Sequence, residues 1–284
     1  MRLLFGFALS ICLASHGYLK KSLSTSGAAA AFFVGLGAMY NDWAVFPLLL
    51  LTFYFTGSRL TKLKAERKKQ IDEEYQDGGQ RSAVQVLCNA LWGTLIAVWH
   101  QYTFGGGRIT CLFEHPFTTK LFLLYLGHYA TCNGDTWASE IGVLHKDWPI
   151  LITTLKKVPP GTNGGVSPLG LVASLFGGFV IGIVAFVSLG LSGGCDRWMW
   201  ELIPIASLAG FIGSLVDSVL GATVQKTLYS EKSRKITYAT TADKGVKVIT
   251  ADKGVKVITA DKDVKVISGW DLLDNNQLLL LRAV

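Results

Sequence analysis

Long apolar blocks alternate with shorter polar stretches along most of the chain. Seven apolar blocks stand out, at residues 3–19, 27–41, 43–57, 83–100, 120–133, 169–191 and 202–224. A helix needs about 20 apolar residues to cross a bilayer, and the last two blocks reach that length. The blocks at 27–41, 43–57 and 120–133 are short, so we expect them to be tilted, broken or re-entrant. The pattern predicts an all-α polytopic integral membrane protein with about seven transmembrane or re-entrant helices.

The first block also fits a secretory signal peptide, with Arg2 as its charged start. A transmembrane helix is the interpretation we favour, because further apolar blocks follow and no clear cleavage site precedes a soluble domain. Composition agrees with a membrane protein: half of the 284 residues are hydrophobic and 17% are charged, whereas soluble domains carry about 25% charged residues.

Basic residues collect on one side of the predicted membrane domain. If all seven blocks cross, 23 of the 27 Lys and Arg residues fall on alternate loops and the C-terminal tail. The positive-inside rule places that side in the cytosol and the N-terminus opposite. The net charge of +7 then reflects topology and attraction to lipid headgroups, and no nucleic-acid partner is needed. We expect a multi-pass protein of an intracellular membrane such as the endoplasmic reticulum. Nothing in the pattern indicates an oligomeric state.

The chain divides into a membrane helix domain, residues 1–228, and a cytosolic tail, residues 229–284. The tail contains three tandem nonapeptides at 241–267, two reading TADKGVKVI and one TADKDVKVI. Three copies are too few to stack into a solenoid. We therefore expect a mobile insertion, with residues 232–267 making few contacts with the membrane domain.

Two carboxylates end the fifth apolar block, Asp135 and Glu140 in the stretch CNGDTWASEIG, residues 132–142. Carboxylates near membrane depth are costly and usually functional, and they are ligands that Mg²⁺ accepts. Five residues on an unbroken helix turn by about 140°. Both side chains can therefore reach one ion only if the helix breaks near Asn133-Gly134, and Asp135 is the stronger candidate for a direct ligand.

Other polar residues lie within the predicted helices. Arg81, Gln85 and Asn89 recur every four residues, so they share one helix face. Asp217 lies beside a stripe of small residues in the seventh block, which predicts that it points at a neighbouring helix and not at lipid. The small stripes that we expect to be packing seams are Gly170, Ser174, Gly178 and Gly182 in the sixth block and Ala206, Gly210, Ser214 and Ser218 in the seventh.

A glycine-rich loop precedes the sixth block, TTLKKVPPGTNGGVSPLG at residues 153–170. Ser167 and Pro168 are typical of a helix N-cap and first turn. A glycine-rich loop leading into a helix can bind phosphate through its backbone N–H groups, although by itself the motif fits an ordinary tight loop better. The candidate phosphate-binding residues here are Lys156, Gly161, Thr162, Asn163, Gly164, Gly165 and Ser167.

Together these features point to phosphoryl transfer, which relies on magnesium, cationic side chains and backbone donors. A site at the membrane face suggests a lipid substrate. One alternative is a transporter or channel with Gln85, Asn89 and Asp217 along its path, though the polar groups of a transporter should gather near the midplane. The other is a non-catalytic membrane relative.

Several long stretches resemble the transmembrane protein 19 family, which includes the plant plastid phytyl-phosphate kinase. They are LKKSLSTSGA, LTKLKAERKKQIDEEYQDGGQRSAVQVLCNA, NGDTWASEIG, LITTLKKVPPGTNGGVSPLGLVASLFGG, GSLVDSVLGATVQ and LDNN. The resemblance implies a multi-pass kinase that uses a nucleoside triphosphate, ATP or CTP, to phosphorylate an isoprenoid (phytyl or prenyl) phosphate.

A more distant resemblance is to CTP-using polyprenol and phytol kinases, through Gly134-Asp135-x-x-Ala138 and a late Asp274-Asn275. The candidate catalytic residues are therefore Asp135, Asp217 and Lys157. The candidate metal ligands are Asp135, Glu140 and Asp274, and Asn275 joins Arg81, Gln85 and Asn89 among the candidate phosphate ligands. The family pattern continues into a further helix after LDNN, whereas this chain ends in QLLLLRAV, so we expect a shortened last segment.

Overall fold

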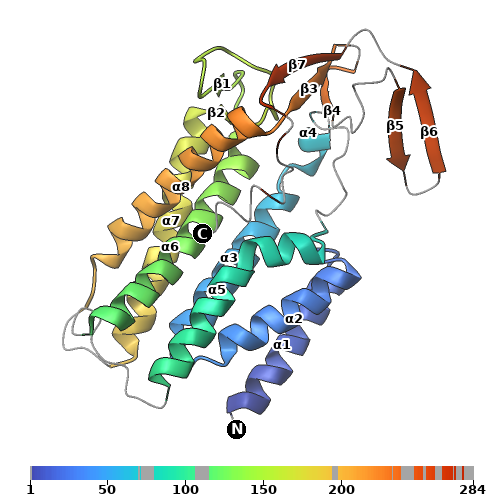
Figure 1. The fold of residues 1–284 in the computed structure, drawn as a ribbon. Helices are drawn as coiled ribbons and strands as arrows, with labels where there is room; N and C mark the ends of the chain where they lie inside the picture. Colours follow the sequence, from blue (N-terminus) through green and yellow to red (C-terminus); the bar gives the residue numbers. More distant parts are fainter. Residues whose placement is uncertain are drawn as a thin grey trace.

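The protein is described by a computed structural model covering residues 2–69, 71, 80–105, 115–193, 198–231, 233–237, 246–251, 254–259, 264–270, 272 and 277. Seven long helices correspond to the seven apolar blocks: α1 (Arg2–Leu19), α2 (Thr25–Met39), α3 (Val45–Lys62), α5 (Ala83–Phe104), α6 (Pro116–Gly142), α7 (Pro168–Leu191) and α8 (Leu202–Val224) (Figure 1). The short α4 (Ala65–Lys69) follows α3. The predicted fold class, an all-α polytopic membrane protein, is confirmed.

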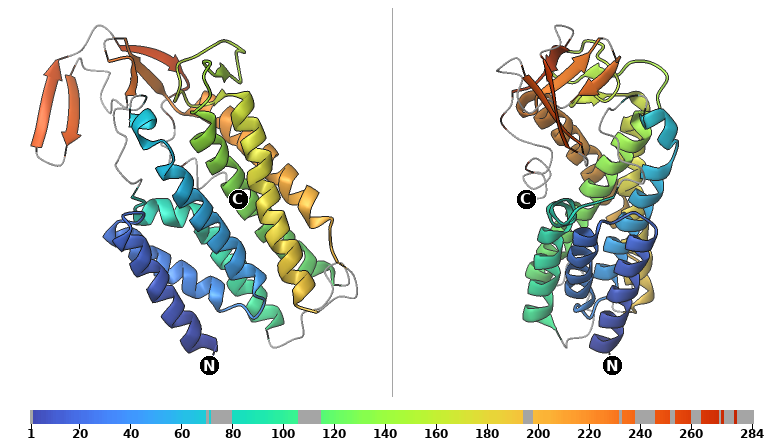
Figure 2. Two further views of the ribbon diagram at one scale, coloured as in Figure 1. Left: turned by 180° about the vertical axis from the view of Figure 1, so that it is seen from behind. Right: turned by 90° about the vertical axis from the view of Figure 1, so that its right-hand side faces the viewer.

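Within the part of the chain that the structure describes, three helices are by length and composition able to cross a membrane, namely α5, α7 and α8. Shorter apolar helices cover Leu4–Leu19 and Thr25–Met39. Figures 1 and 2 show the long helices running alternately up and down, so that α1, α3, α6 and α8 all lead towards the end that carries the β-strands. The described segments that follow α3, α6 and α8 lie at that end, whereas the α1–α2 connection lies further from it.

Serine caps begin three of the helices. Ser24, Ser82 and Ser167 each accept a hydrogen bond from a backbone N–H in the first turn of α2, α5 and α7. Pro168 occupies the first turn of α7, where its missing N–H costs nothing. The predicted start of this helix is confirmed.

Helices α6, α7 and α8 pack through small residues. A Cβ atom added at Gly134 of α6 would lie 2.7 Å from the Gly210 Cα of α8, and one at Gly177 of α7 would lie 2.8 Å from the Gly134 Cα. One at Gly178 would meet the Ala206 carbonyl oxygen at 2.3 Å. The predicted small stripes are therefore packing seams.

The helix is unbroken at Asn133-Gly134, so the condition for Asp135 and Glu140 to share one ion is not met. Helix α6 continues for 27 residues to Gly142. Asn133 is fully buried, its Nδ2 donates to the Gly177 carbonyl at 2.8 Å, and Thr56 Oγ1 donates to its Oδ1 at 2.8 Å. Tertiary contacts therefore stabilise the helix at two residues that favour turns in isolation.

The described residues form three small antiparallel sheets, and two of them lie over one end of the helices. In the first sheet, β1 (Ile150–Leu151) pairs with β2 (Gly165–Val166). In the second, β3 (Thr227–Ser230) lies between β4 (Lys235–Thr237) and β7 (Val264–Ser268). In the third, β5 (Val246–Ala251) pairs with β6 (Gly254–Thr259), and this pair projects to the side.

The expectation of few contacts across residues 232–267 is wrong for its two ends. Ile236 is buried, and its N–H donates to the Ile71 carbonyl at 3.0 Å. The third nonapeptide copy supplies β7, which pairs with β3 directly after α8. The strand that follows α8 is β3, and an unpaired edge of β3 would leave backbone N–H and C=O groups without partners. The Val-Lys-Val stretch of the third copy pairs with this edge as β7. β3 also crosses the expected domain boundary at residue 228.

Candidate functional site

The two carboxylates of the α6 stretch face different helices. Ser214 Oγ of α8 lies 3.5 Å from Asp135 Oδ1. Glu140 faces the other way, where Thr61 Oγ1 donates to its Oε1 at 2.7 Å and Lys68 Nζ donates to its Oε2 at 2.5 Å. Because α6 is unbroken, the side chains diverge by about 140°. The structure does not bring Asp135 and Glu140 to one point.

Lys68 is a residue that sequence reasoning missed. It is 5% exposed, and besides Glu140 its ammonium donates to the carbonyls of Leu60 and Thr61 at 2.8 and 3.2 Å. Carbonyls in the last turn of a helix need such donors, and a cation there also complements the helix dipole. Lys68 therefore ties the end of α3 to α6, and Glu140 is part of that structural contact.

Asp135 and Asp217 lie at equivalent levels of two adjoining helices. One turn before them, Thr131 Oγ1 donates to the Ala209 carbonyl at 3.1 Å, and a Cβ atom at Gly213 would lie 2.3 Å from the Thr131 Cγ2. Both helices run towards the strand end of the molecule, so Asp135 and Asp217 each lie about one turn beyond this contact. Ser214 already links the two helices at this level.

The glycine-rich loop packs against the same helix, one turn beyond Asp217. Gly164 has φ +78°, and a Cβ atom there would lie 2.5 Å from the Ser218 carbonyl oxygen. The Asn163 N–H donates to Thr227 Oγ1 at 3.2 Å, and the Gly165 N–H donates to the Thr162 carbonyl at 2.9 Å. These two N–H groups bind within the fold, so they are not directed at a phosphate.

Thr162 and Ser167, two other predicted phosphate-binding residues of this loop, make hydrogen bonds within the fold. The Thr162 hydroxyl donates to the Pro159 carbonyl at 2.7 Å, and Ser167 caps α7 while its hydroxyl donates to the Gly142 carbonyl at 3.1 Å. Gly161 needs its φ of +89° for the turn. Lys156 and Lys157 are exposed at the hairpin next to β1. They are the cations of the loop with room to reach an external anion.

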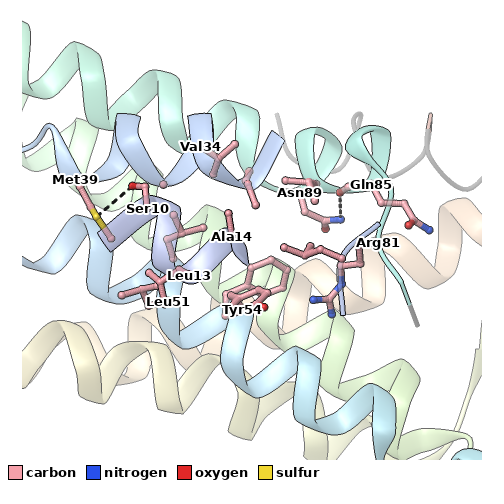
Figure 3. A pocket seen from close by; sticks show the side chains of 17 residues that line it. Ser10, Leu13, Ala14, Val34, Met39, Leu51, Tyr54, Arg81, Gln85 and Asn89 are labelled. Atoms are coloured by element: carbon pink, nitrogen blue, oxygen red, sulfur yellow. Dashed lines mark hydrogen bonds between the residues drawn. The ribbon is translucent and has the colours of Figure 1, made fainter. Parts of the chain in front are cut away.

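Arg81, Gln85 and Asn89 line one end of a cavity between α1, α2, α3 and α5 (Figure 3). Helix α5 begins only at Ala83, so Arg81 lies in the loop before it. The Arg81 backbone bonds to Ser22 and Ser24, and its Nη1 donates to Ser58 Oγ at 3.2 Å. Burial lowers the pKa of the Arg81 guanidinium, and the negative charge of Glu140 opposes this shift.

The polar end of the cavity adjoins the α6 stretch. A Cβ atom added at Gly57 of α3 would lie 3.1 Å from Arg81 Nη2 and 3.5 Å from Thr136 Cγ2. The guanidinium of Arg81 therefore lies next to Thr136, the residue after Asp135. The predicted site residue Arg81 and the predicted site segment around Asp135 are about 50 positions apart in the chain. They come together here beside Gly57 of α3.

The candidate metal site rests on few protein ligands. Among the residues that the structure describes, no group of three or more His, Cys, Asp or Glu side chains could hold a metal ion. Asp274 and Asn275 lie outside the described residues. Mg²⁺ is commonly held by one or two carboxylates together with substrate phosphates and water, and Asp135 and Asp217 fit that smaller donor set.

Comparisons with known proteins agree with this architecture. Protein PGR of Arabidopsis thaliana is 41% identical over 242 residues, which cover 83% of each chain. The uncharacterized membrane protein sll0875 of Synechocystis sp. is 31% identical over 211 residues, covering 72% of this chain and 73% of that protein. Protein VTE6, chloroplastic, of Arabidopsis thaliana is 29% identical over 211 residues, covering 73% of this chain and 58% of that protein.

No solved structure matches the chain. The profile of one protein family, described as integral membrane protein DUF92, matches residues 8–284. This match covers most of α1 and all of the helices from α2 to α8. The chain therefore belongs to the DUF92 family of integral membrane proteins.

Proposed function

We propose that this protein is a kinase that transfers a phosphoryl group from ATP or CTP to an isoprenoid phosphate, with Mg²⁺ as cofactor. The observation that carries the proposal is the meeting of Arg81, at the end of an apolar cavity, with the Asp135 segment of α6. A cation at the end of an apolar cavity suits a lipid with an anionic headgroup. Carboxylates beside it suit the magnesium-bound phosphates of a nucleotide.

The motif resemblance to the transmembrane protein 19 family and its phytyl-phosphate kinase supports the same reaction. In the proposed step, an oxygen of the lipid phosphate attacks the terminal phosphorus of the nucleotide. A new P–O bond forms while the bond to the β-phosphate oxygen breaks, and the nucleoside diphosphate leaves. Such a step needs positioning and charge stabilisation more than covalent help from the protein.

Each residue then has a distinct part. Asp135 and Asp217, each about one turn beyond the same α6–α8 contact, would hold Mg²⁺ on the nucleotide phosphates. Lys156 and Lys157, exposed on the neighbouring hairpin, would contact those phosphates from the aqueous side. Glu140 acts indirectly, since its contact with Lys68 holds α3 against α6 and so positions Arg81.

The compartment follows from where nucleotides are available. We infer that the end carrying the basic loops and strands faces the cytosol or an equivalent nucleotide-containing space. An endoplasmic reticulum location remains an expectation, because the printed name of the relative VTE6 points to chloroplasts. The apolar lining of the cavity fits a lipid chain better than the polar path that a transporter would need.

A direct assay tests the proposal. The purified protein in nanodiscs is incubated with phytyl, geranylgeranyl or farnesyl phosphate and with radiolabelled ATP or CTP, and the lipid products are separated by chromatography. We expect a lipid diphosphate that requires Mg²⁺ and vanishes with EDTA, and no product from the free alcohols. Failure of all six combinations to give a diphosphate would refute the kinase proposal.

A further inference from the structure

The cavity between α1, α2, α3 and α5 is strongly asymmetric. Figure 3 shows Arg81, Gln85 and Asn89 gathered at one end, with Ser10 and Met39 at the other. Arg81 is the single charged residue among the described residues that line it, and most of the others are aliphatic or aromatic. A ligand that matches this lining has one anionic end and one apolar body.

We propose that this cavity is the acceptor site, holding one isoprenoid chain lengthwise with its phosphate at Arg81. The inference rests on the proposed function for the reaction, but the binding site itself can exist without it. It also assigns Arg81 to the lipid phosphate and not to the nucleotide, which the exposed lysines and the carboxylates of α6 and α8 would bind on the other side of Thr136.

The backbone of Arg81 is fixed by hydrogen bonds, which suits a phosphate-binding role. Its N–H donates to the Ser22 carbonyl at 3.0 Å, and its own carbonyl accepts from the Ser24 N–H at 3.1 Å. Gly27 makes this approach feasible, because a Cβ atom there would lie 2.0 Å from the Arg81 carbonyl oxygen. The Arg81 side chain thus lines the end of the cavity from a fixed backbone, with its guanidinium between Ser58 and Thr136. Its planar fork matches phosphate oxygens in two-point contacts, which a flexible lysine cannot reproduce.

The remaining polar groups fit the headgroup end. Gln85 Oε1 accepts from the Ser82 N–H at 2.9 Å, and Asn89 Nδ2 donates to the Gln85 carbonyl at 2.8 Å. These bonds hold both amides on the first turns of α5, next to Arg81. The polar end is therefore built from one loop residue and one helix face, and it is ordered before a ligand arrives.

The far end limits the depth of the cavity. Ser10 Oγ donates to Met39 Sγ at 3.5 Å across it. Along α2 the lining runs from Ala31 to Met39, which is about 12 Å at 1.5 Å per residue. This length suits the part of one isoprenoid chain that lies nearest the phosphate. Small residues such as Ala31 leave the space that the chain would occupy.

Binding of radiolabelled geranylgeranyl phosphate to the nanodisc protein tests the site. Arg81→Gln should weaken this binding at least tenfold and leave binding of a non-hydrolysable Mg²⁺-ATP or Mg²⁺-CTP analogue within twofold. Ala31→Leu should weaken lipid binding at least fivefold, whereas Ala29→Leu, an exposed position on the same helix, should change nothing. Geranylgeraniol should bind weakly and equally to wild type and Arg81→Gln, and neither inorganic phosphate nor phosphatidic acid should compete well.

The outcomes separate this inference from the kinase proposal. Lipid binding that responds to Arg81 and Ala31 without any phosphoryl transfer supports the site and refutes the kinase. Phosphoryl transfer in which Ala31→Leu behaves like Ala29→Leu, or in which Arg81→Gln impairs the nucleotide and not the lipid, overturns the site. Effective competition by phosphatidic acid would overturn the single-chain ligand. Arg81→Lys, with an unchanged melting temperature, serves as the folded variant if Arg81→Gln proves unstable.

Discussion

Replacing Glu140 by glutamine distinguishes a structural ion pair from a metal ligand. In the structure Glu140 accepts from Thr61 and contacts Lys68, whose side chain is 6% exposed. Glutamine keeps the size and one acceptor oxygen but removes the negative charge. The buried ammonium of Lys68 would then retain only the neutral carbonyls of Leu60 and Thr61.

The expected cost follows from the burial of the pair. At the effective dielectric constant near 20 that suits protein sites, unit charges 4 Å apart attract by about 4 kcal/mol. Removing one partner of a buried pair costs about 3–5 kcal/mol, because the other charge stays desolvated. The Glu140 side chain is still 21% exposed, so we expect a loss below that of a fully buried pair, about 2–3 kcal/mol. At 2–4 °C per kcal/mol the melting temperature should fall by roughly 4–12 °C.

A double-mutant cycle in nanodiscs measures the interaction directly. Lys68→Met, Glu140→Gln and the double variant are compared by thermal unfolding, and the double variant should lose less than the sum of the singles by about 1–3 kcal/mol. Asp147→Asn, at a carboxylate that is 81% exposed, is the matched control and should stay within about 0.5 kcal/mol. An unchanged melting temperature for Glu140→Gln, together with a raised Mg²⁺ requirement, would show that Glu140 is a metal ligand and the reasoning is mistaken.

Two further predictions concern packing. Gly134→Ala should lower the free energy of unfolding by about 2 kcal/mol or more, because the added methyl group meets the backbone of α8. Gly127→Ala on the same helix has no heavy atom of the described residues within 4 Å of the added methyl group, so it should be neutral or up to about 1 kcal/mol stabilising. Equal unfolding temperatures for the two variants would contradict the close α6–α8 crossing. Deleting residues 241–258 should leave the melting temperature unchanged, since the third copy still supplies β7 and the eight remaining linker residues reach well beyond the roughly 12 Å from the end of β4 to the start of β7. Deleting 241–267 should lower it by several degrees, and a full deletion without effect would show that β7 is dispensable.

The number of helices could be predicted from the sequence because hydropathy in a bilayer is a local property. Each apolar block became one helix, and Ser167 and Pro168 marked the start of α7 as their chemistry requires. Close helix packing along the small-residue stripes of α7 and α8 could also be predicted, because small side chains at helical spacing let neighbouring helices approach closely.

Features that depend on distant partners could not be predicted. Asn133-Gly134 favours a turn locally, yet contacts with α3, α7 and α8 keep the helix intact. Glu140 was read as a ligand because Lys68 is 72 positions away in sequence and has no distinguishing motif. The third nonapeptide copy differs from the others mainly in having β3 beside it, which composition alone cannot show.

Phosphoryl transfer by an Asp135→Asn variant tests the central claim most directly. Asparagine keeps the size of the side chain and its contact with Ser214, while it removes the charge proposed to hold magnesium. We predict that the melting temperature stays near the wild-type value and that Mg²⁺-dependent formation of the lipid diphosphate falls more than tenfold, at least about 1.4 kcal/mol in the barrier. Asp147→Asn, a highly exposed carboxylate just beyond α6, should keep full activity. Normal turnover by Asp135→Asn would show that this carboxylate serves only helix packing, and the proposed magnesium site would be wrong.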